Sequence, residues 1–282
     1  MRKTCAIGLL VGLLLNACTP KKQTSEVNDL SSDESGYFGQ KPPGLMPEVL
    51  PKELLATGKW KLGGLYAPKK EEFYLTTTDT VPFGPTVVFF RKENRAWKQY
   101  DFYATGNDTL YCKDTYIERT DTGWSAIKSL GPAFEDIPIM RLTASAQGTL
   151  VFDEGTRDGN GMLRYSRLIN GKREAPKLFG PTINTGKWTA HPFIAPDESY
   201  LIWDSEREGG YGDSDMYISF KQDDGSWGKA INFGDKINTY GEDGGGYVTP
   251  DGKYLSYCPH CDPPYESMWL DAKIIEDLRM KQ

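Results

Sequence analysis

The chain has 282 residues and a formal net charge of −6, and 38% of its residues are hydrophobic. That length is sufficient for one hydrophobic core and is typical of a single domain. The mildly acidic balance offers no basic face, so nothing favours a nucleic-acid partner. The 30 glycines, 18 prolines and 16 tyrosines favour a β-rich fold with many turns.

Residues 1–17 have the pattern of a signal peptide, with Arg2 and Lys3 ahead of an apolar stretch that is short for a membrane span. The segment Leu15-Asn16-Ala17-Cys18 resembles a bacterial lipobox. The resemblance implies cleavage before Cys18 and attachment of lipid to its thiol and amine. The alternative is an ordinary secreted protein with a chance cysteine. By analogy with the sorting of Gram-negative lipoproteins, Thr19 favours the outer membrane, facing either the periplasm or the cell surface.

The mature chain begins with a polar stretch. Residues 18–36 contain few apolar side chains, so they predict a flexible tether between the anchor and the fold. The remaining residues, 37–282, are expected to form the folded domain.

A repeated pattern runs through this domain. Short apolar runs separated by Gly, Pro, Asn and Asp predict strands joined by tight turns. Each unit has four such runs, which predicts a four-stranded antiparallel sheet. Five copies of the first turn begin at Ala67, Ala104, Ser145, Ala195 and Thr249. Their spacing is close to the roughly 40–50 residues of a propeller blade, so we expect an all-β propeller of about five blades, with six as the alternative.

The last two units carry the most specific motifs. Ala195-Pro196-Asp197 and the segment 249–253 resemble the Ser-Pro-Asp-Gly-Lys core of the WD40-like repeat in TolB-type propellers. Segments 209–215 and 232–238 resemble two further motifs of a family of bacterial lipoproteins built from such repeats. The resemblance covers about residues 37–279. It implies a β-propeller and says little about activity, because propellers have many functions.

The two ends of the domain complete the expected fold. The fifth unit has no fourth strand of its own, so the segment Pro47–Pro51 is expected to supply this outer strand and cover an open edge. Near the C-terminus, Ile274, Ile275 and Leu278 recur at helical spacing. They predict a short helix that docks on the propeller, and a partner-binding helix is the alternative.

The cysteines indicate disulfide bonding rather than catalysis. Cys258-Pro259-His260-Cys261 has the pattern of periplasmic thiol oxidants, but it follows a predicted strand and precedes prolines instead of opening a helix. Cys112, Cys258 and Cys261 are therefore disulfide candidates, paired either as 258–261 or through Cys112.

No cofactor or metal is expected. Zinc would need a second group of close ligands. Asp213 and Asp215 lack the remaining ligands of a calcium-binding EF-hand loop.

Enzyme motifs are weak. There is no Gly-x-Ser-x-Gly elbow and no glycine-rich phosphate loop. The segment 223–227 is similar to the Asp-box of sialidases, but its Trp lies too close to its Gly.

A binding site is predicted from position alone. Loops between successive blades should gather at one mouth of the central channel. We expect the ring there to be Glu135, Asp136, His191, Glu242 and Asp243, with Arg157 and Arg207 beside it. The alternative is a solvated polar rim. The leading function is a non-catalytic scaffold of the cell envelope that binds a protein or a glycan. A glycoside hydrolase, sialidase-like, or another hydrolase at the same mouth is the alternative.

Overall fold

A computed structural model describes residues 43–49, 60–67, 72–78, 86–93, 96–102, 109–120, 123–125, 128–249, 252–260 and 267–281. The expected signal peptide, the tether, Cys18 and Cys261 lie outside these residues, as does the side chain of Cys112. Within the described segments, no helix is long and apolar enough to cross a membrane.

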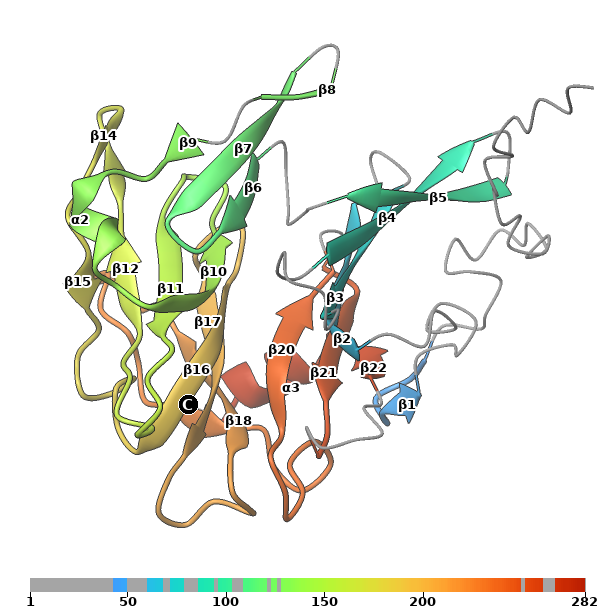
Figure 1. Ribbon diagram of the computed structural model, residues 1–282. Coiled ribbons are helices and arrows are strands. Elements are labelled where there is room, and N and C mark those ends of the chain that lie inside the picture. Colours follow the sequence, from blue (N-terminus) through green and yellow to red (C-terminus); the bar gives the residue numbers. More distant parts are fainter. Residues whose placement is uncertain are drawn as a thin grey trace, which may run out of the picture.

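The described strands form five antiparallel sheets and one separate hairpin (Figure 1). The first sheet contains β2 (Trp60–Ala67), β3 (Glu72–Thr78), β4 (Thr86–Glu93) and β5 (Ala96–Phe102). The second contains β6 (Thr109–Cys112) and β7 (Thr115–Thr120), and β7 also pairs with β8 (Gly123–Trp124) and β9 (Lys128–Ser129). The third contains β10 (Ile139–Ala144), β11 (Leu150–Glu154), β12 (Arg164–Ser166) and β15 (Lys177–Leu178).

The remaining elements follow the same plan. The fourth sheet contains β16 (Lys187–Ile194), β17 (Tyr200–Glu206), β18 (Asp215–Phe220) and β19 (Ile231–Asn232). The fifth contains β20 (Gly244–Val248), β21 (Tyr254–Cys258), β22 (Met268–Asp271) and β1 (Glu48–Val49). The hairpin is β13 (Leu168–Ile169) with β14 (Lys172–Arg173). Two helices are described, α2 (Pro132–Glu135) and α3 (Ile274–Arg279).

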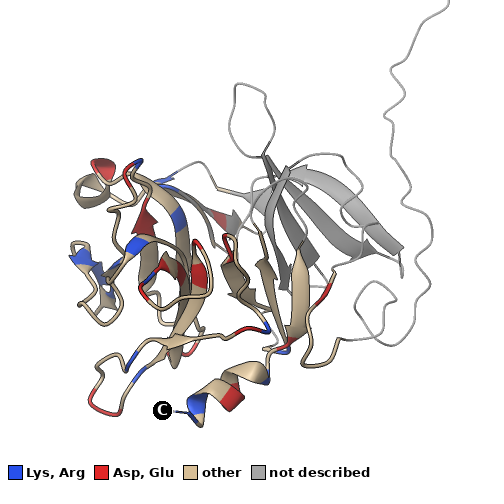
Figure 2. Ribbon diagram, turned by 90° about the horizontal axis from the view of Figure 1, so that it is seen from below, with Lys and Arg blue, Asp and Glu red and all other residues tan. Residues whose placement is uncertain are grey.

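The sheets follow one another around a ring. The inner strand β10 contacts β6 on one side and β16 on the other, while β16 contacts β20 and β20 contacts β2. Figure 2 shows the tan sheets side by side from below. Each sheet is therefore a blade, and the described strands make a β-propeller of five blades. The predicted fold class is confirmed.

Both expectations about the chain ends are also confirmed. Strand β1 pairs with β22, with Glu48 opposite Trp269 and Val49 opposite Met268. The N-terminal segment thus supplies the outer strand of the last blade. Helix α3 turns Ile274, Ile275 and Leu278 inward, and all three are buried.

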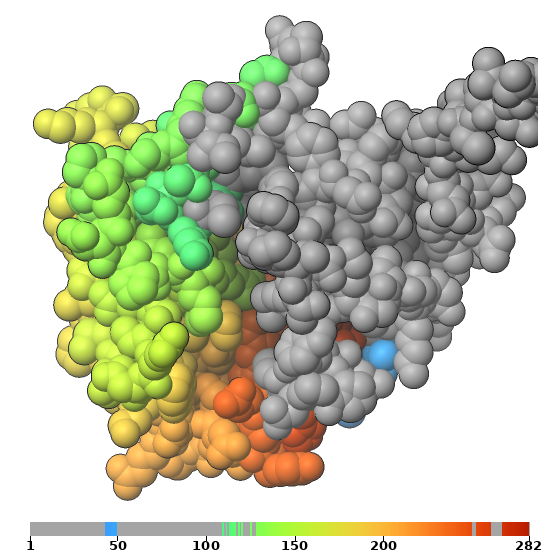
Figure 3. All heavy atoms as spheres, viewed as in Figure 1, coloured from blue at the N-terminus to red at the C-terminus, as the bar shows by residue number. Residues whose placement is uncertain are grey.

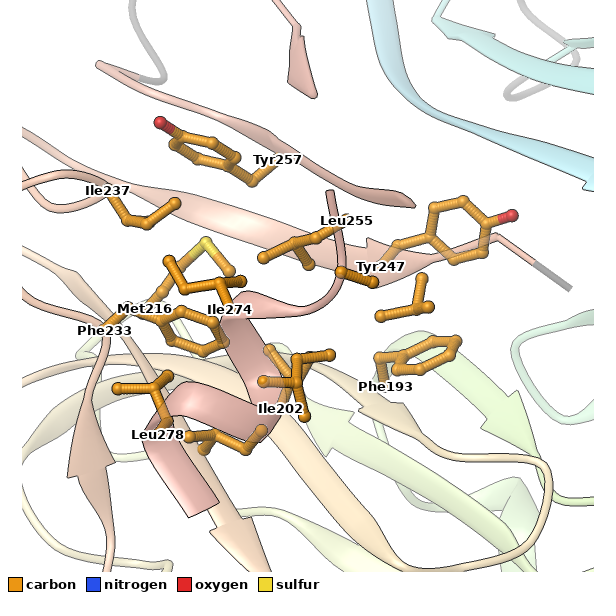
Figure 4. Packing of buried hydrophobic residues seen from close by; sticks show 14 of the residues in the cluster. Phe193, Ile202, Met216, Phe233, Ile237, Tyr247, Leu255, Tyr257, Ile274 and Leu278 are labelled. Atoms are coloured by element: carbon orange, nitrogen blue, oxygen red, sulfur yellow. The ribbon is translucent and has the colours of Figure 1, made fainter. Parts of the chain in front are cut away.

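The largest hydrophobic cluster lies between the fourth and fifth blades. Figure 4 shows side chains from β16, β17, β18, β20, β21 and α3 converging there. Ile202 and Leu255 are fully buried at its centre. Burial of such side chains contributes roughly 1.5–3 kcal/mol each, so this cluster fixes the angle between the two blades and holds α3 against them.

Two blades differ from the repeat pattern. Ala144 pairs with Leu150, whereas Ile194 pairs with Leu201. The first turn of the third blade is therefore one residue shorter than the matching turn of the fourth. In addition, β5 directly precedes the turn expected at Ala104. It pairs with β4 and is the outer strand of the first blade.

An asparagine at the connections after the third and fourth blades explains one of the sequence motifs. The Asn238 side chain accepts a hydrogen bond from Met216 N at 2.8 Å and donates to Met216 O at 3.1 Å. Asn184 makes the same pair of bonds with Leu163 in the third blade, at 2.8 and 3.0 Å. A side-chain amide can satisfy a backbone N–H and C=O together. In these two blades the asparagine therefore links the connection to the next blade with the backbone at or just before the third strand of its own blade.

The pairing of β1 with β22 yields a test of closure. Deleting residues 43–49 removes this pairing and the 2.8 Å hydrogen bond from Asp271 N to Gly44 O. We expect the melting temperature to fall by about 5 °C or more, as measured by circular dichroism.

The matched control is the double substitution Glu48→Ala and Val49→Ala. Both side chains are exposed, and the strand pairs through its backbone, so this variant should melt close to the wild type. A deletion variant as stable as the full chain would show that β1 is not needed for closure.

Candidate functional site

The inner strands of the third and fourth blades, together with the strands next to them, place four charged or titratable side chains close together. We call Arg141, Asp153, His191 and Asp204 the inner-strand cluster. Arg141 and His191 lie on β10 and β16, at matching places where the pairing with the second strand shifts register. Gly245 occupies the matching place on β20.

Asp153 joins the third blade to the fourth. It is fully buried on β11. Its Oδ1 accepts hydrogen bonds from Arg141 N at 2.7 Å and Met140 N at 3.2 Å, and its Oδ2 accepts one from His191 N at 2.8 Å. One carboxylate thus satisfies three backbone donors that the irregular strands leave without ladder partners.

Asp204 repeats this role one blade further on. Its Oδ1 accepts a hydrogen bond from Gly245 N at 3.0 Å, so it joins the fourth blade to the fifth. When the repeats are aligned at the start of their first turns, Asp153 corresponds to Trp203. Because the first turn of the third blade is one residue shorter, β11 is shifted by one residue. In space, Asp153 therefore corresponds to Asp204.

His191 is held by both aspartates. Its Nδ1 lies 3.0 Å from Asp204 Oδ2, and its backbone N–H donates to Asp153. Its φ of 49° is in the left-handed region, which costs energy for a residue with a side chain. The His191 side chain is 36% exposed and that of Asp204 is 6% exposed, so solvent reaches the imidazole and hardly reaches the carboxylate.

Glycines on β20 make room for this arrangement. A Cβ atom on Gly244 would lie 2.8 Å from the Asp204 carboxylate, and one on Gly246 would lie 2.4 Å from the Met216 side chain. The guanidinium of Arg141 crosses from β10 to this strand, where Nη2 lies 3.4 Å from Gly246 O. The glycine run 244–246 therefore admits a carboxylate on one side and a guanidinium on the other.

The cluster shifts two pKa values. Burial lowers the pKa of His191, and the nearby Arg141 charge lowers it further. The attraction of Asp204 and Asp153 outweighs both effects, so the pKa of His191 is raised. Burial also lowers the pKa of Arg141, and the attraction of the same two carboxylates offsets this in part.

The predicted ring residues lie in different surroundings. Glu135, Asp136, Arg157 and Glu242 are exposed. Asp243 is fully buried, and its carboxylate accepts hydrogen bonds from Thr239 N and Thr239 Oγ1. Burial, the largest effect, raises the pKa of Asp243. A binding role for these residues and for His191 stays a prediction.

Arg207 packs inside the fourth blade. Its guanidinium carbon lies 4.6 Å from the centre of the Tyr217 ring and 5.3 Å from that of Trp203, and Nη2 donates to Ile183 O at 2.5 Å. These contacts hold the side chain against aromatic faces, where burial lowers the pKa of Arg207.

Five loops at one end of the propeller form a continuous rim, which we call the mouth. They are residues 155–161, 185–188, 207–214, 239–243 and 258–260. Trp188 N donates to Gly159 O at 2.8 Å, Gly212 packs on the backbone of Tyr240, and Gly241 packs on the ring of His260. Figure 3 shows the part around 207–214 and 239–243 as an orange to red-orange surface at the lower end of the molecule.

The mouth presents aromatic side chains to solvent. Trp188 is 49% exposed, Tyr211 50% and Tyr240 82%. A Cβ on Gly159 would lie 2.5 Å from the Trp188 ring, so the indole rests directly on the glycine backbone. The rings of Tyr240 and His260 have centroids 4.5 Å apart. These contacts support Trp188 from beneath and place the Tyr240 ring against His260.

Metal and disulfide chemistry receive no support from geometry at the described residues. In the ranges given above, no three His, Cys, Asp or Glu side chains gather as metal ligands. Cys258 ends β21 near the mouth. Cys261 and the side chain of Cys112 are not described, so the disulfide candidates stay a prediction.

No family model and no curated protein matches the chain. Among solved structures, it is similar to TolB from Acinetobacter baumannii, with 10% identity and a TM-score of 0.45, over 76% of this chain and 54% of that one. The chain thus spans little more than half the length of that TolB.

It is also similar to a putative TolB from Agrobacterium tumefaciens, with 15% identity and a TM-score of 0.44, over 76% of this chain and 78% of that one. A gluconolactonase from Xanthomonas campestris matches with 11% identity and a TM-score of 0.43, over 83% of this chain and 97% of that one. The propeller assignment rests on the pairing and order of the sheets themselves.

The raised pKa of His191 yields a test by NMR. With two histidines in the sequence, each imidazole signal can be assigned with one substitution. We expect the titration midpoint of His191 to lie above the usual value of about 6.5, because Asp204 and Asp153 favour the charged ring over the opposing Arg141 charge. The stability that protonated His191 contributes is then fully present below about pH 6.5 and is lost as pH rises through the higher folded-state pKa.

Asp204→Asn is the matched change, because the amide oxygen can still accept from Gly245 N while the charge is removed. It should lower the midpoint of His191. A wild-type midpoint at or below the usual value, or one that Asp204→Asn leaves unchanged, would contradict the assigned ion pair.

Proposed function

We propose that this propeller is a non-catalytic binding module of the cell envelope, which captures a protein or a glycan at its mouth. The observation that carries the proposal is the exposure of Trp188, Tyr211 and Tyr240 on one continuous rim. Large exposed aromatic side chains are typical of binding surfaces, since they bury much area and lose little conformational freedom. The contacts beneath Trp188 and Tyr240 preorganise the surface.

The inner-strand cluster favours binding over hydrolysis. Most glycoside hydrolases need a carboxyl group that is free to exchange a proton with the substrate. The carboxylate oxygens of Asp153 and Asp204 instead accept hydrogen bonds from backbone N–H groups, and Asp204 also contacts His191. Proton transfer by Asp153 or Asp204 would therefore compete with the contacts that join the blades.

The proposal includes a lipid anchor at Cys18. The sequence around this cysteine supports it, and residues 18–36 would act as the tether. Several acyl chains would hold the protein stably on the outer membrane. The mouth would then be free to meet partners at some distance from the bilayer.

Substitutions at the mouth test the binding proposal. Tyr240→Ala and Trp188→Ala should each reduce the partner captured from solubilised envelope by about tenfold or more, because aromatic anchors dominate binding energy. Capture is measured by quantitative pull-down on immobilised protein, followed by mass spectrometry for proteins and sugar analysis for glycans.

Ile169→Ala is the control. Ile169 is similarly exposed, but it lies on the hairpin β13–β14, at the opposite end of the third blade from the mouth. This variant should capture as much as the wild type. Undiminished capture by both aromatic variants, or an equal loss with Ile169→Ala, would place the binding surface elsewhere.

The anchor has a separate test. Cys18→Ser should move the protein from the membrane fraction to the soluble fraction, since the hydroxyl cannot be lipidated in place of the thiol. Fractionation and immunoblotting measure the change, and metabolic labelling with a fatty-acid analogue should mark the wild type alone. A mutant that stays with membranes and still incorporates label would rule out lipidation at Cys18.

A further inference from the structure

Arg141 is a strong hydrogen-bond donor that the fold uses very little. A guanidinium carries five N–H donors. The structure gives this guanidinium one contact, the 3.4 Å approach of Nη2 to Gly246 O. At the described residues no carboxylate lies within ion-pair distance of Arg141, although Asp153 and Asp204 are near enough to influence its charge. The nearby carboxylates are taken up by the backbone and by His191.

The position of Arg141 makes these donors accessible. The side chain starts on β10 and reaches β20, and β16 lies between those two inner strands. It therefore passes on the inner side of the ring and not through a blade. Its Nη1 lies 3.7 Å from the place where Gly245 would carry a Cβ. Arg141 is half-buried and His191 is partly exposed, so solvent reaches both residues.

We propose that Arg141 and His191 form a binding site for a ligand carboxylate at the centre of the propeller, with the glycine run 244–246 as its side wall. This site lies deeper than the mouth, and it stands whether or not the mouth captures an envelope partner. Arg141 supplies paired N–H donors that match the two oxygens of a carboxylate. Protonated His191 supplies a second donor, because its Nδ1–H is engaged by Asp204 and its Nε2–H is left for the ligand.

Charge selects a carboxylate over a phosphate. Two potential positive groups, Arg141 and His191, face two buried negative groups, Asp153 and Asp204. A ligand with a single negative charge adds little repulsion to this balanced set. A dianionic phosphate would bring a second negative charge close to both aspartates in a region of reduced dielectric, which is unfavourable.

The test uses the full-length protein without added histidines and follows the His191 imidazole signals by NMR. Two probes carry a carboxylate from different sources, glucuronate for a sugar acid and N-acetylalanine for the end of a peptide. At least one should shift the His191 signal saturably while the His260 signal stays in place. The probe that binds more tightly identifies the source of the carboxylate. Glucose, which lacks the carboxylate, should have no effect.

Variants assign the site to Arg141. Arg141→Gln should weaken probe binding by about tenfold or more, because a charge-assisted hydrogen-bonded pair is lost. Arg167→Gln is the matched control, because Arg167 is an exposed arginine of the same blade outside the mouth, and it should bind like the wild type. If Arg141→Gln does not fold, Arg141→Lys keeps the charge but loses the paired donors, and it should also bind several-fold more weakly.

Three results would overturn the proposal. The first is the absence of a saturable shift of the His191 signal with either carboxylate. The second is equal binding by the wild type and the folded Arg141 variant. The third is tighter binding of inorganic phosphate than of both carboxylates, which would contradict the charge argument.

Discussion

The structure depends on buried carboxylates that join one blade to the next. Asp153 accepts hydrogen bonds from its own blade at Arg141 N and from the following blade at His191 N. Asp204 continues the series by accepting from Gly245 N. The inner strands bulge at these points, which leaves backbone donors without ladder partners. A buried N–H group without a partner costs about 1–3 kcal/mol, so each carboxylate stabilises both the bulges and the interface between blades. Arg141 and His191 lie at the same bulges.

The regular features of the fold could be predicted from the sequence, because they follow local rules. Alternating apolar runs and glycine turns marked the blades, the missing fourth strand of the last unit pointed to the N-terminal segment, and the helical spacing of Ile274, Ile275 and Leu278 marked α3. The inner-strand cluster could not be predicted in the same way. Asp153 and Asp204 match in space only because one turn is a residue shorter, and a repeat alignment by motif places Asp153 with Trp203 instead. No sequence motif marks Arg141, because its guanidinium contacts Gly246 on a strand about a hundred residues further along the chain.

Three of the six described residues other than glycine that have a positive φ carry aromatic rings. Trp188, His191 and His260 all have φ values near 50°, a conformation that costs about 1–2 kcal/mol for residues other than glycine. Trp188 and His260 belong to the mouth, and His191 belongs to the inner-strand cluster. Glycine would relieve the strain at each position, but it would remove the ring that contacts Gly159, Asp204 or Tyr240. At these three positions the strain therefore accompanies a ring that is held against a neighbouring residue.

The pairing of β1 with β22 also sets the order in which the molecule can mature. The paired residues are about 220 positions apart in the chain, so the last blade stays incomplete until almost the entire polypeptide is available. A chain that is synthesised from its N-terminus presents β1 first, and β1 stays unpaired until β22 follows. Until the two strands meet, each can pair with other extended chains. The two-residue strand limits that risk, because so short an edge offers a foreign strand little to pair with.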